Sequence, residues 1–155
     1  NIPLDVTQDL IQHELSENGV NEGTNKNRKP FTKAKILVAE DHEFNKIFIK
    51  KLLKKFDCDD FDIVENGVHV LSAIDNKNYD MILMDCHMPE MNGYEATKNI
   101  RKNGNDIPII AMTADAMVGT KEACLEIGMN DYISKPIDSG VLKSVLSRWF
   151  IMEEA

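Results

Sequence analysis

The chain has 155 residues, a formal net charge of -8 and 43% hydrophobic residues, which suits one ordinary folded domain with a tail. The acidic balance argues against non-specific binding to nucleic acid or to an anionic membrane, because both need surplus lysine and arginine. No apolar run approaches the roughly 20 residues that cross a bilayer, so we expect no direct membrane contact.

The cysteines and the first residue bear on the cellular setting. Cys58, Cys86 and Cys124 are an odd set without CxxC spacing, which favours neither a disulfide framework nor a zinc site. A reducing cytoplasm fits this pattern. The sequence begins with Asn1 rather than Met and has no signal segment, so we expect a fragment of a longer protein whose parent could be membrane-bound.

Residues 1–33 differ from the rest in having thinly spread apolar side chains and a polar stretch without periodicity. We interpret them as a linker, in which Thr7 as a cap and Gly19 as a stop allow a short helix over about 7–17. The folded domain is expected over residues 34–152.

From Lys35 onward, short apolar runs alternate with helical patterns, as in a parallel sheet covered by helices. The predicted strands are residues 35–39, 60–64, 81–84, 107–112 and 132–134. The predicted helices are one built on Phe44, Phe48, Leu52 and Phe56, three near 67–77, 92–103 and 116–127, and one through 141–150. Five such units fit a doubly wound open α/β sheet or a truncated barrel. Because the length is far too short for a closed eightfold barrel, we predict the open sheet.

Polar side chains follow four of the predicted strands. Glu40 and Asp41 follow the first, Asp85 the third, Thr113 the fourth and Lys135 the fifth. Ligands of open parallel sheets sit at the carboxyl ends of the strands. We therefore expect these side chains to meet there.

Three carboxylates at one sheet edge repel one another unless a cation neutralises them, and an all-oxygen site suits Mg²⁺ rather than zinc. The Lys135 ammonium and the Thr113 hydroxyl would complete a pocket for a transferring phosphoryl group, with one carboxylate as the nucleophile.

Four segments, ILVAEDHEFN, ILMDCHMPEMNGYE, PIIAMTA and DYISKPI, resemble the receiver domains of response regulators, particularly the C-terminal receivers of hybrid sensor histidine kinases. The resemblance covers about residues 34–152. It implies a flavodoxin-like doubly wound (βα)5 fold with a five-stranded parallel sheet in the order 2-1-3-4-5.

The resemblance also implies roles for individual residues. Asp85 would accept a phosphoryl group from phosphohistidine. Asp41, Asp85 and the backbone carbonyl of His87 would bind Mg²⁺ directly, and Glu40 would act through a water. Lys135 would pair with the phosphoryl oxygens, and the Lys135-Pro136 peptide would be cis.

Thr113 and Tyr132 match the switch pair of the family, which turns phosphorylation into a shape change on the face of the fourth helix, fifth strand and fifth helix. Tyr132 by itself fits an ordinary aromatic residue at the end of a strand equally well. His87 and Asp115 occupy positions that tune the lifetime of the phosphoryl group, although His87 fits a merely exposed residue as well. Phe44 stands where related receivers dock the donor, yet its spacing with Phe48 fits a core position equally.

Two other functions compete with a signalling receiver. A phosphatase of the haloacid dehalogenase type usually has a second aspartate two residues after the nucleophile, and here that position holds His87. A degenerate receiver used as a scaffold is disfavoured by the intact set of Glu40, Asp41, Asp85, Thr113 and Lys135.

The resemblance implies a histidine kinase core, with its dimerisation and phosphotransfer domain, or a histidine phosphotransfer protein as partner. An isolated receiver catalyses only its own phosphorylation and dephosphorylation. The absence of an output domain after Ala155 favours a receiver at the end of a hybrid kinase.

Overall fold

A computed structural model describes residues 28–114 and 119–152. Its core is a five-stranded sheet in the order β2-β1-β3-β4-β5, and every neighbouring pair of strands is parallel. The strands are β1 (Ile36–Ala39), β2 (Phe61–Val64), β3 (Met81–Asp85), β4 (Ile109–Thr113) and β5 (Asp131–Ser134). The predicted flavodoxin-like fold and its strand order are therefore confirmed.

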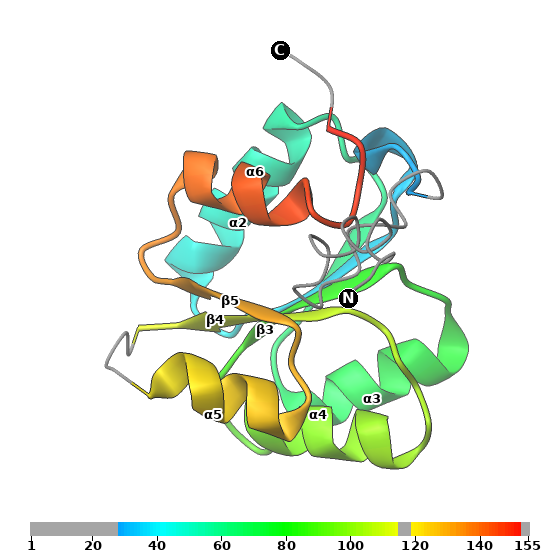
Figure 1. The fold of residues 1–155 in the computed structure, drawn as a ribbon, viewed down its shortest axis with the longest axis vertical. Coiled ribbons are helices and arrows are strands. Elements are labelled where there is room, and N and C mark those ends of the chain that lie inside the picture. Colours follow the sequence, from blue (N-terminus) through cyan, green and yellow to red (C-terminus); the bar gives the residue numbers. More distant parts are fainter. Residues whose placement is uncertain (1–27, 115–118, 153–155) are drawn as a thin grey trace, which may run out of the picture.

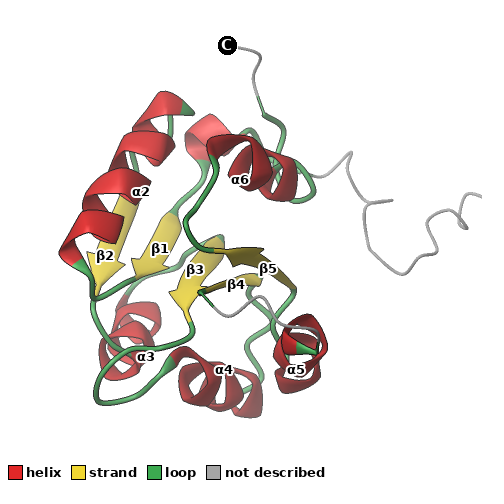
Figure 2. Ribbon diagram, turned by 90° about the vertical axis from the view of Figure 1, so that its left-hand side faces the viewer, coloured by secondary structure: helices red, strands yellow, loops and turns green. Residues whose placement is uncertain are grey.

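Helices cover both faces of this sheet (Figures 1 and 2). One layer consists of α2 (Glu43–Lys55) and α6 (Ser139–Leu146), and the other of α3 (Gly67–Asn76), α4 (Gly93–Lys102) and α5 (Thr120–Ile127). Each layer packs its own cluster of buried apolar side chains against the sheet. Because β1, β3 and β4 are buried on both faces, their sequences are nearly continuous apolar runs.

Several element ends have a local chemical cause. The Asn92 side chain accepts from the Glu95 backbone N–H, and the Glu95 side chain accepts in return from the Asn92 N–H, which caps α4. Gly128, with a φ of 120°, ends α5 as the sequence predicts. β4 begins at Ile109 rather than Ile107, because Pro108 has no N–H to give to a ladder.

The predicted apolar stripe of α2 is partly wrong. Ile49, Leu52 and Leu53 form the buried face, whereas Phe44 is 77% exposed and Phe48 is 41% exposed. The first turn of α2 lies at the edge where the strands end (Figure 2), so no sheet is available to cover these two rings.

Part of the predicted linker packs onto the domain. Pro30 and Ile151 form a parallel bridge, and the Phe31 N–H donates to the Ile151 carbonyl at 2.9 Å. Phe31, in the short 3-10 helix η2 (Phe31–Lys33), is 1% exposed and packs against Phe150 with 5.2 Å between ring centroids. We call residues 28–33 the N-terminal strap.

Two predictions fall on residues that the structure leaves out. The helix over about 7–17 and the residues 115–118, with Asp115, lie outside the described ranges. Within those ranges, no helix has the length and apolar character needed to cross a bilayer.

Candidate functional site

The register of the sheet brings the predicted site residues to one edge. Ala39 pairs with Met84, so Glu40 and Asp85 follow side by side at the carboxyl ends of β1 and β3. Asp85 pairs with Met112, which places Thr113 one residue further along on the neighbouring strand. All these strand ends converge at the point where the order of connections reverses, the usual ligand position of such sheets.

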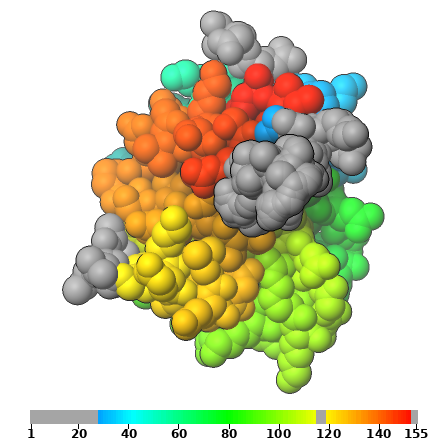
Figure 3. Space-filling model, viewed as in Figure 1, coloured from blue at the N-terminus to red at the C-terminus, as the bar shows by residue number. Residues whose placement is uncertain are grey.

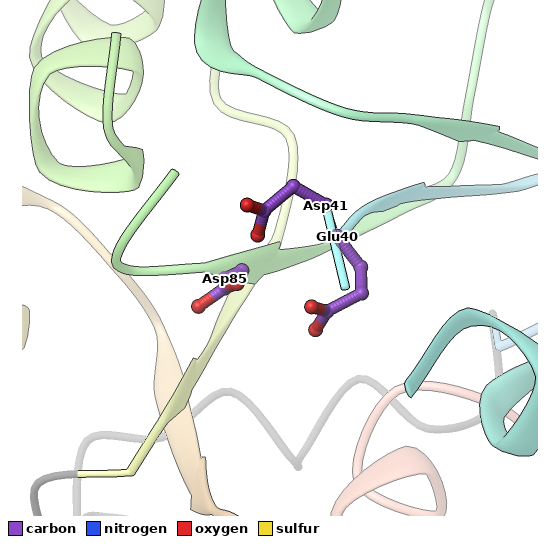
Figure 4. A group of neighbouring side chains, drawn as sticks. All are labelled: Glu40, Asp41 and Asp85. Atoms are coloured by element: carbon purple, nitrogen blue, oxygen red, sulfur yellow. The ribbon is translucent and has the colours of Figure 1, made fainter. Parts of the chain in front are cut away.

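Three carboxylates meet at this edge. Glu40, Asp41 and Asp85 each offer an oxygen, and these oxygens lie within 4.8 Å of one another (Figure 4). Glu40 and Asp85 are 0% and 4% exposed, while Asp41 is open to solvent. Three negative groups this close strongly favour a bound cation.

Lys135 supplies the positive charge of the cluster. Its Nζ lies 3.2 Å from Asp85 Oδ2 and 2.9 Å from Glu40 Oε1. Its backbone N–H donates to the Thr113 carbonyl at 2.8 Å, which ties the start of this loop to β4. Burial by itself lowers the pKa of Lys135, but its contacts with Glu40 and Asp85 outweigh burial and raise that pKa, so the ammonium stays charged. The predicted cis peptide between Lys135 and Pro136 is confirmed.

Opposing interactions act on the pKa of the Asp85 carboxyl group. Burial raises the pKa of its carboxyl group, and the charge of Glu40 acts in the same direction. The His87 backbone N–H donates to Asp85 Oδ1 at 3.1 Å, and this bond together with Lys135 favours the ionised form. The net effect is a raised pKa of Asp85, which means that its negative charge is energetically unfavourable at this buried position.

The donor set fits a divalent cation that prefers oxygen ligands. Glu40 Oε2 accepts from the His42 backbone N–H at 3.0 Å and from Asn45 Nδ2 at 3.4 Å. Glu40 Oε1 is buried and accepts no aligned hydrogen bond from the described residues, although the Lys135 ammonium lies beside it. Together with Asp41 and Asp85, Glu40 gives a hard, all-carboxylate site of the kind Mg²⁺ uses.

The predicted switch residues lie on adjacent strands. Thr113 is the last residue of β4 and is 0% exposed. Tyr132, on β5, is half-buried against the apolar cluster beneath α3, α4 and α5. Tyr132 also lines an open pocket of about 420 Å³ between α5 and α6, on the face shown in Figure 3.

Of the remaining predicted residues, His87 joins the site through its main chain, as its N–H bonds Asp85. Its ring is exposed and meets the Tyr94 ring edge-on, with 6.0 Å between centroids.

Sequence reasoning missed two residues of the site. Asn45, one helical turn after Asp41, donates to Glu40. Gly93 approaches Asp85 so closely that an added Cβ would stand 2.3 Å from the Asp85 carbonyl oxygen. Gly93 is the first residue of α4, and nothing in the local sequence pattern marks its close approach to Asp85.

Comparisons with known proteins agree with this geometry. The sequence profile described as the response regulator receiver domain matches residues 36–147. Hybrid signal transduction histidine kinase I of Dictyostelium discoideum is 45% identical over 122 residues, which cover 73% of this chain. The chain spans only 7% of the length of that kinase.

Two solved structures extend the likeness to three dimensions. The receiver domain of sensor histidine kinase PA1611 from Pseudomonas aeruginosa, with a magnesium ion coordinated in its active site cleft, is 40% identical with a TM-score of 0.68, covering 75% of this chain and 96% of that one. The receiver domain of Saccharomyces cerevisiae Ssk1, crystallised with the histidine phosphotransfer protein Ypd1, is 28% identical with a TM-score of 0.71, covering 78% and 91%.

The matched profile covers most of the chain, the fold is the one its motifs imply, and the aligned relatives are hybrid sensor histidine kinases. This chain therefore belongs to the response regulator receiver domain family and is homologous to the receivers of hybrid sensor histidine kinases.

Proposed function

We propose that this receiver accepts a phosphoryl group from a phosphohistidine onto the carboxylate of Asp85, in a reaction that requires Mg²⁺. One observation carries the proposal. The Asp85 carboxylate lies 3.2 Å from the Lys135 ammonium and within the acidic cluster that it forms with Glu40 and Asp41.

Each residue of the site has a separate role in the transfer of the phosphoryl group. An Asp85 oxygen attacks phosphorus, the O–P bond forms, the P–N bond to histidine breaks, and the electron pair leaves with the imidazole. Lys135 neutralises charge on the phosphoryl oxygens, and the Thr113 hydroxyl donates to one of them. Asp41, Asp85 and the His87 carbonyl would hold Mg²⁺ directly and Glu40 through a water, and the ion would supply further positive charge to the phosphoryl oxygens.

Phosphorylation is read out, in this proposal, through Thr113 and Tyr132. Movement of the Thr113 hydroxyl toward the phosphoryl group would vacate space behind β4, and the Tyr132 ring would turn into it. The pocket of about 420 Å³ that Tyr132 lines between α5 and α6 would change shape as a result.

The partner that carries the histidine is a kinase core, a histidine phosphotransfer protein, or both in turn. The parent is a hybrid sensor kinase, and this domain lies in the cytoplasm. The complex of Ypd1 with a receiver of the same fold supports the first point. Three buried free cysteines are consistent with a reducing compartment. The 77% exposure of Phe44 favours docking over a core role for this ring.

Intact-mass measurement after incubation with Mg²⁺ and acetyl phosphate tests the acceptor. We expect one added phosphoryl group that is labile in base, and none when EDTA removes the metal. Asp85→Asn should take up nothing, while Lys135→Met should react slower by on the order of 10²-fold, because a donor to the developing charge is lost.

Asp59→Asn is the matched control, since Asp59 is exposed and lies outside the cluster; its labelling should equal that of the wild type. Unlabelled wild-type protein would point to a scaffold, and catalytic consumption of acetyl phosphate with many turnovers to a phosphatase. Either result would contradict the proposal.

A further inference from the structure

The loop between β3 and α4 carries main-chain groups of the candidate site. We call residues 86–92 the acceptor loop. Within it, the His87 N–H donates to Asp85 Oδ1 at 3.1 Å. The loop closes where the Gly93 N–H donates to the Cys86 carbonyl at 3.1 Å. The place of the His87 main chain therefore depends on how the rest of the acceptor loop is held.

The later part of the acceptor loop is bonded to the start of α3. Gly67, the first residue of α3, donates its N–H to the Met91 carbonyl at 2.8 Å. The first N–H groups of a helix have no acceptor within that helix, so they can bind a neighbouring segment. The Asn66 side chain accepts from the His69 N–H. The start of α3 thus uses one N–H for its own cap and another for the acceptor loop.

Position 67 has room only for a glycine. A Cβ there would stand 2.7 Å from both the carbonyl oxygen and the Cγ atom of Met91. Gly67 is buried, and its φ lies outside the left-handed region that favours glycine. The glycine is therefore required for the close approach of two backbones and not for an unusual conformation.

The turn that presents Met91 is not favoured by its own sequence. Glu90 has a φ of 67°, which is uncommon for a residue with a side chain. Such a conformation persists where surrounding contacts hold it. Here the Met91 N–H donates to the Pro89 carbonyl at 2.7 Å, and the Met91 side chain packs against the apolar cluster beneath α3, α4 and α5. The bond from Gly67 holds the same residue.

We propose that Gly67 is a positioning residue for phosphoryl transfer, although none of the site residues described above follows β2. By holding Met91, it keeps the acceptor loop where the His87 N–H meets Asp85 and where the His87 carbonyl can take a metal ion. Gly67 acts through the loop and touches no reacting group. This inference rests on the proposed function and adds to it the residue that sets the loop.

A purely structural contact is the competing explanation. The bond between Gly67 and Met91 also joins the start of α3 to the segment before α4. A packing role would lower stability alone and leave the metal affinity of the folded chain unchanged. A positioning role predicts weaker binding of Mg²⁺, because the loop that offers the His87 carbonyl is displaced.

Gly67→Ala tests the role through metal affinity. Mg²⁺ is titrated into the wild-type chain and the variant while NMR follows the backbone amides of Asp85 and His87. We expect the dissociation constant for Mg²⁺ to rise about tenfold, as for the loss of a group that orients a metal ligand. Labelling by acetyl phosphate should slow by about the same factor at limiting Mg²⁺. It should approach the wild-type rate as Mg²⁺ is raised.

Gly128→Ala serves as the control for strain. Gly128 has a φ of 120°, and a Cβ there would stand 2.9 Å from the Arg101 side chain, so this substitution is strained as well. Because Gly128 comes before β5, it lies toward the amino ends of the strands, away from the site. The control should lower the midpoint of urea denaturation and leave the Mg²⁺ dissociation constant unchanged.

Hydrogen exchange in the wild-type chain covers the case in which Gly67→Ala does not fold. Coupling between two sites is reciprocal, so Mg²⁺ binding should slow exchange of the Gly67 amide. The Gly104 amide donates to the Arg101 carbonyl after α4, at the opposite edge of the sheet, and its exchange should not change.

An unchanged Mg²⁺ dissociation constant in folded Gly67→Ala, or equal weakening in the Gly128 control, would overturn the inference. Exchange at Gly67 that does not respond to Mg²⁺ would do so as well. Labelling of the wild-type chain by acetyl phosphate is measured in parallel. A labelled wild-type chain with any of these results refutes only this inference, whereas an unlabelled wild-type chain refutes the proposed function.

Discussion

Gly93 shows how tightly the backbone of the acceptor is enclosed. Its N–H donates to the Cys86 carbonyl at 3.1 Å, which folds the loop after β3 back onto the strand. A Cβ at this position would stand 2.3 Å from the Asp85 carbonyl oxygen and 2.8 Å from the Met84 side chain. A glycine is needed here for close approach, not for an unusual φ.

Gly93→Ala should therefore displace the Asp85 backbone. We expect a loss of about 1–3 kcal/mol in the free energy of unfolding and phosphorylation by acetyl phosphate that is slower by on the order of 10²-fold. Urea denaturation and intact-mass kinetics measure the two effects. Gly104→Ala is the control, because Gly104 has a φ of 83° and open space around it.

The control separates stability from chemistry. Gly104→Ala should cost about 1 kcal/mol through its backbone conformation and leave the labelling rate unchanged. Equal labelling rates in the Gly93 variant and the wild type would contradict the positioning role.

For individual residues, sequence reasoning could find Glu40, Asp85 and Lys135, because each directly follows a predicted strand and parallel strands end at a common edge. It could not find Gly93. That contact exists only because the loop after β3 returns to the strand, and no periodicity encodes the path of a loop.

The N-terminal strap packs against the residues that follow α6. Phe31 and Phe150 bring the two segments together at the edge of the core between α2 and α6. Their backbones are joined by the bonds from Phe31 to Ile151 and from Ile151 to Lys29.

Phe31→Ala should lower the free energy of unfolding by about 3–5 kcal/mol, because it empties a fully buried ring site. Phe44→Ala, the same substitution at a 77% exposed position, should change it by less than about 0.5 kcal/mol. Urea denaturation of the two variants and the wild type measures both values. Similar losses in the two variants would contradict the assignment of the strap to the core.

A polar contact links the edge strand β2 to the segment before β3. The Tyr79 hydroxyl donates to Asp62 Oδ2 at 2.6 Å, and this bond, with Lys77, lowers the pKa of Asp62. A lowered pKa means that stability from Asp62 is fully present above its unfolded pKa of about 3.9. That stability is lost as pH falls through the folded pKa.

Tyr79→Phe should reduce the free energy of unfolding by about 1 kcal/mol or less at neutral pH, since the Asp62 side chain is 46% exposed and partly screened. The difference from the wild type should shrink as the pH falls below about 3.9, where Asp62 becomes protonated in the unfolded chain, and shrink further until the pH passes the lower pKa of Asp62 in the folded state. Denaturant titrations at several pH values measure it. A difference that stays constant down to acidic pH would show that the hydroxyl contributes in some other way.

Element identities follow from sequence more reliably than element ends. The apolar runs of β1, β3 and β4 predict these strands, because strands buried on both faces must be continuously apolar. The end of α6 was not predictable in this way. Its apolar pattern runs on to Phe150, but the helix stops at Leu146, and the chain turns so that Phe150 can meet the strap.

On the scale of the whole molecule, the site is a consequence of topology. The chain passes from β1 outward to β2 and then returns to β3 on the other side of β1, so the loops after β1 and β3 diverge and leave room between them. The acidic cluster stands at this gap (Figure 4). The number of βα units and the motifs at their ends suffice to predict this arrangement.

The exposed end of α2 could not be predicted from its sequence, because the spacing of Phe44, Phe48 and Leu52 is equally that of a buried stripe. Only the position of the helix relative to the sheet edge shows which of these side chains is covered. For this reason the site was predictable at the level of its charged residues, and its surroundings were not.

Reductive mapping of the phosphorylated residue tests the central claim most directly. The chain is labelled with acetyl phosphate and Mg²⁺, treated with borohydride, which reduces an acyl phosphate to an alcohol, and digested for peptide sequencing by mass spectrometry. The account predicts homoserine at position 85 and intact aspartate at position 41. Reduction at position 41 in place of 85, or at neither, would contradict it.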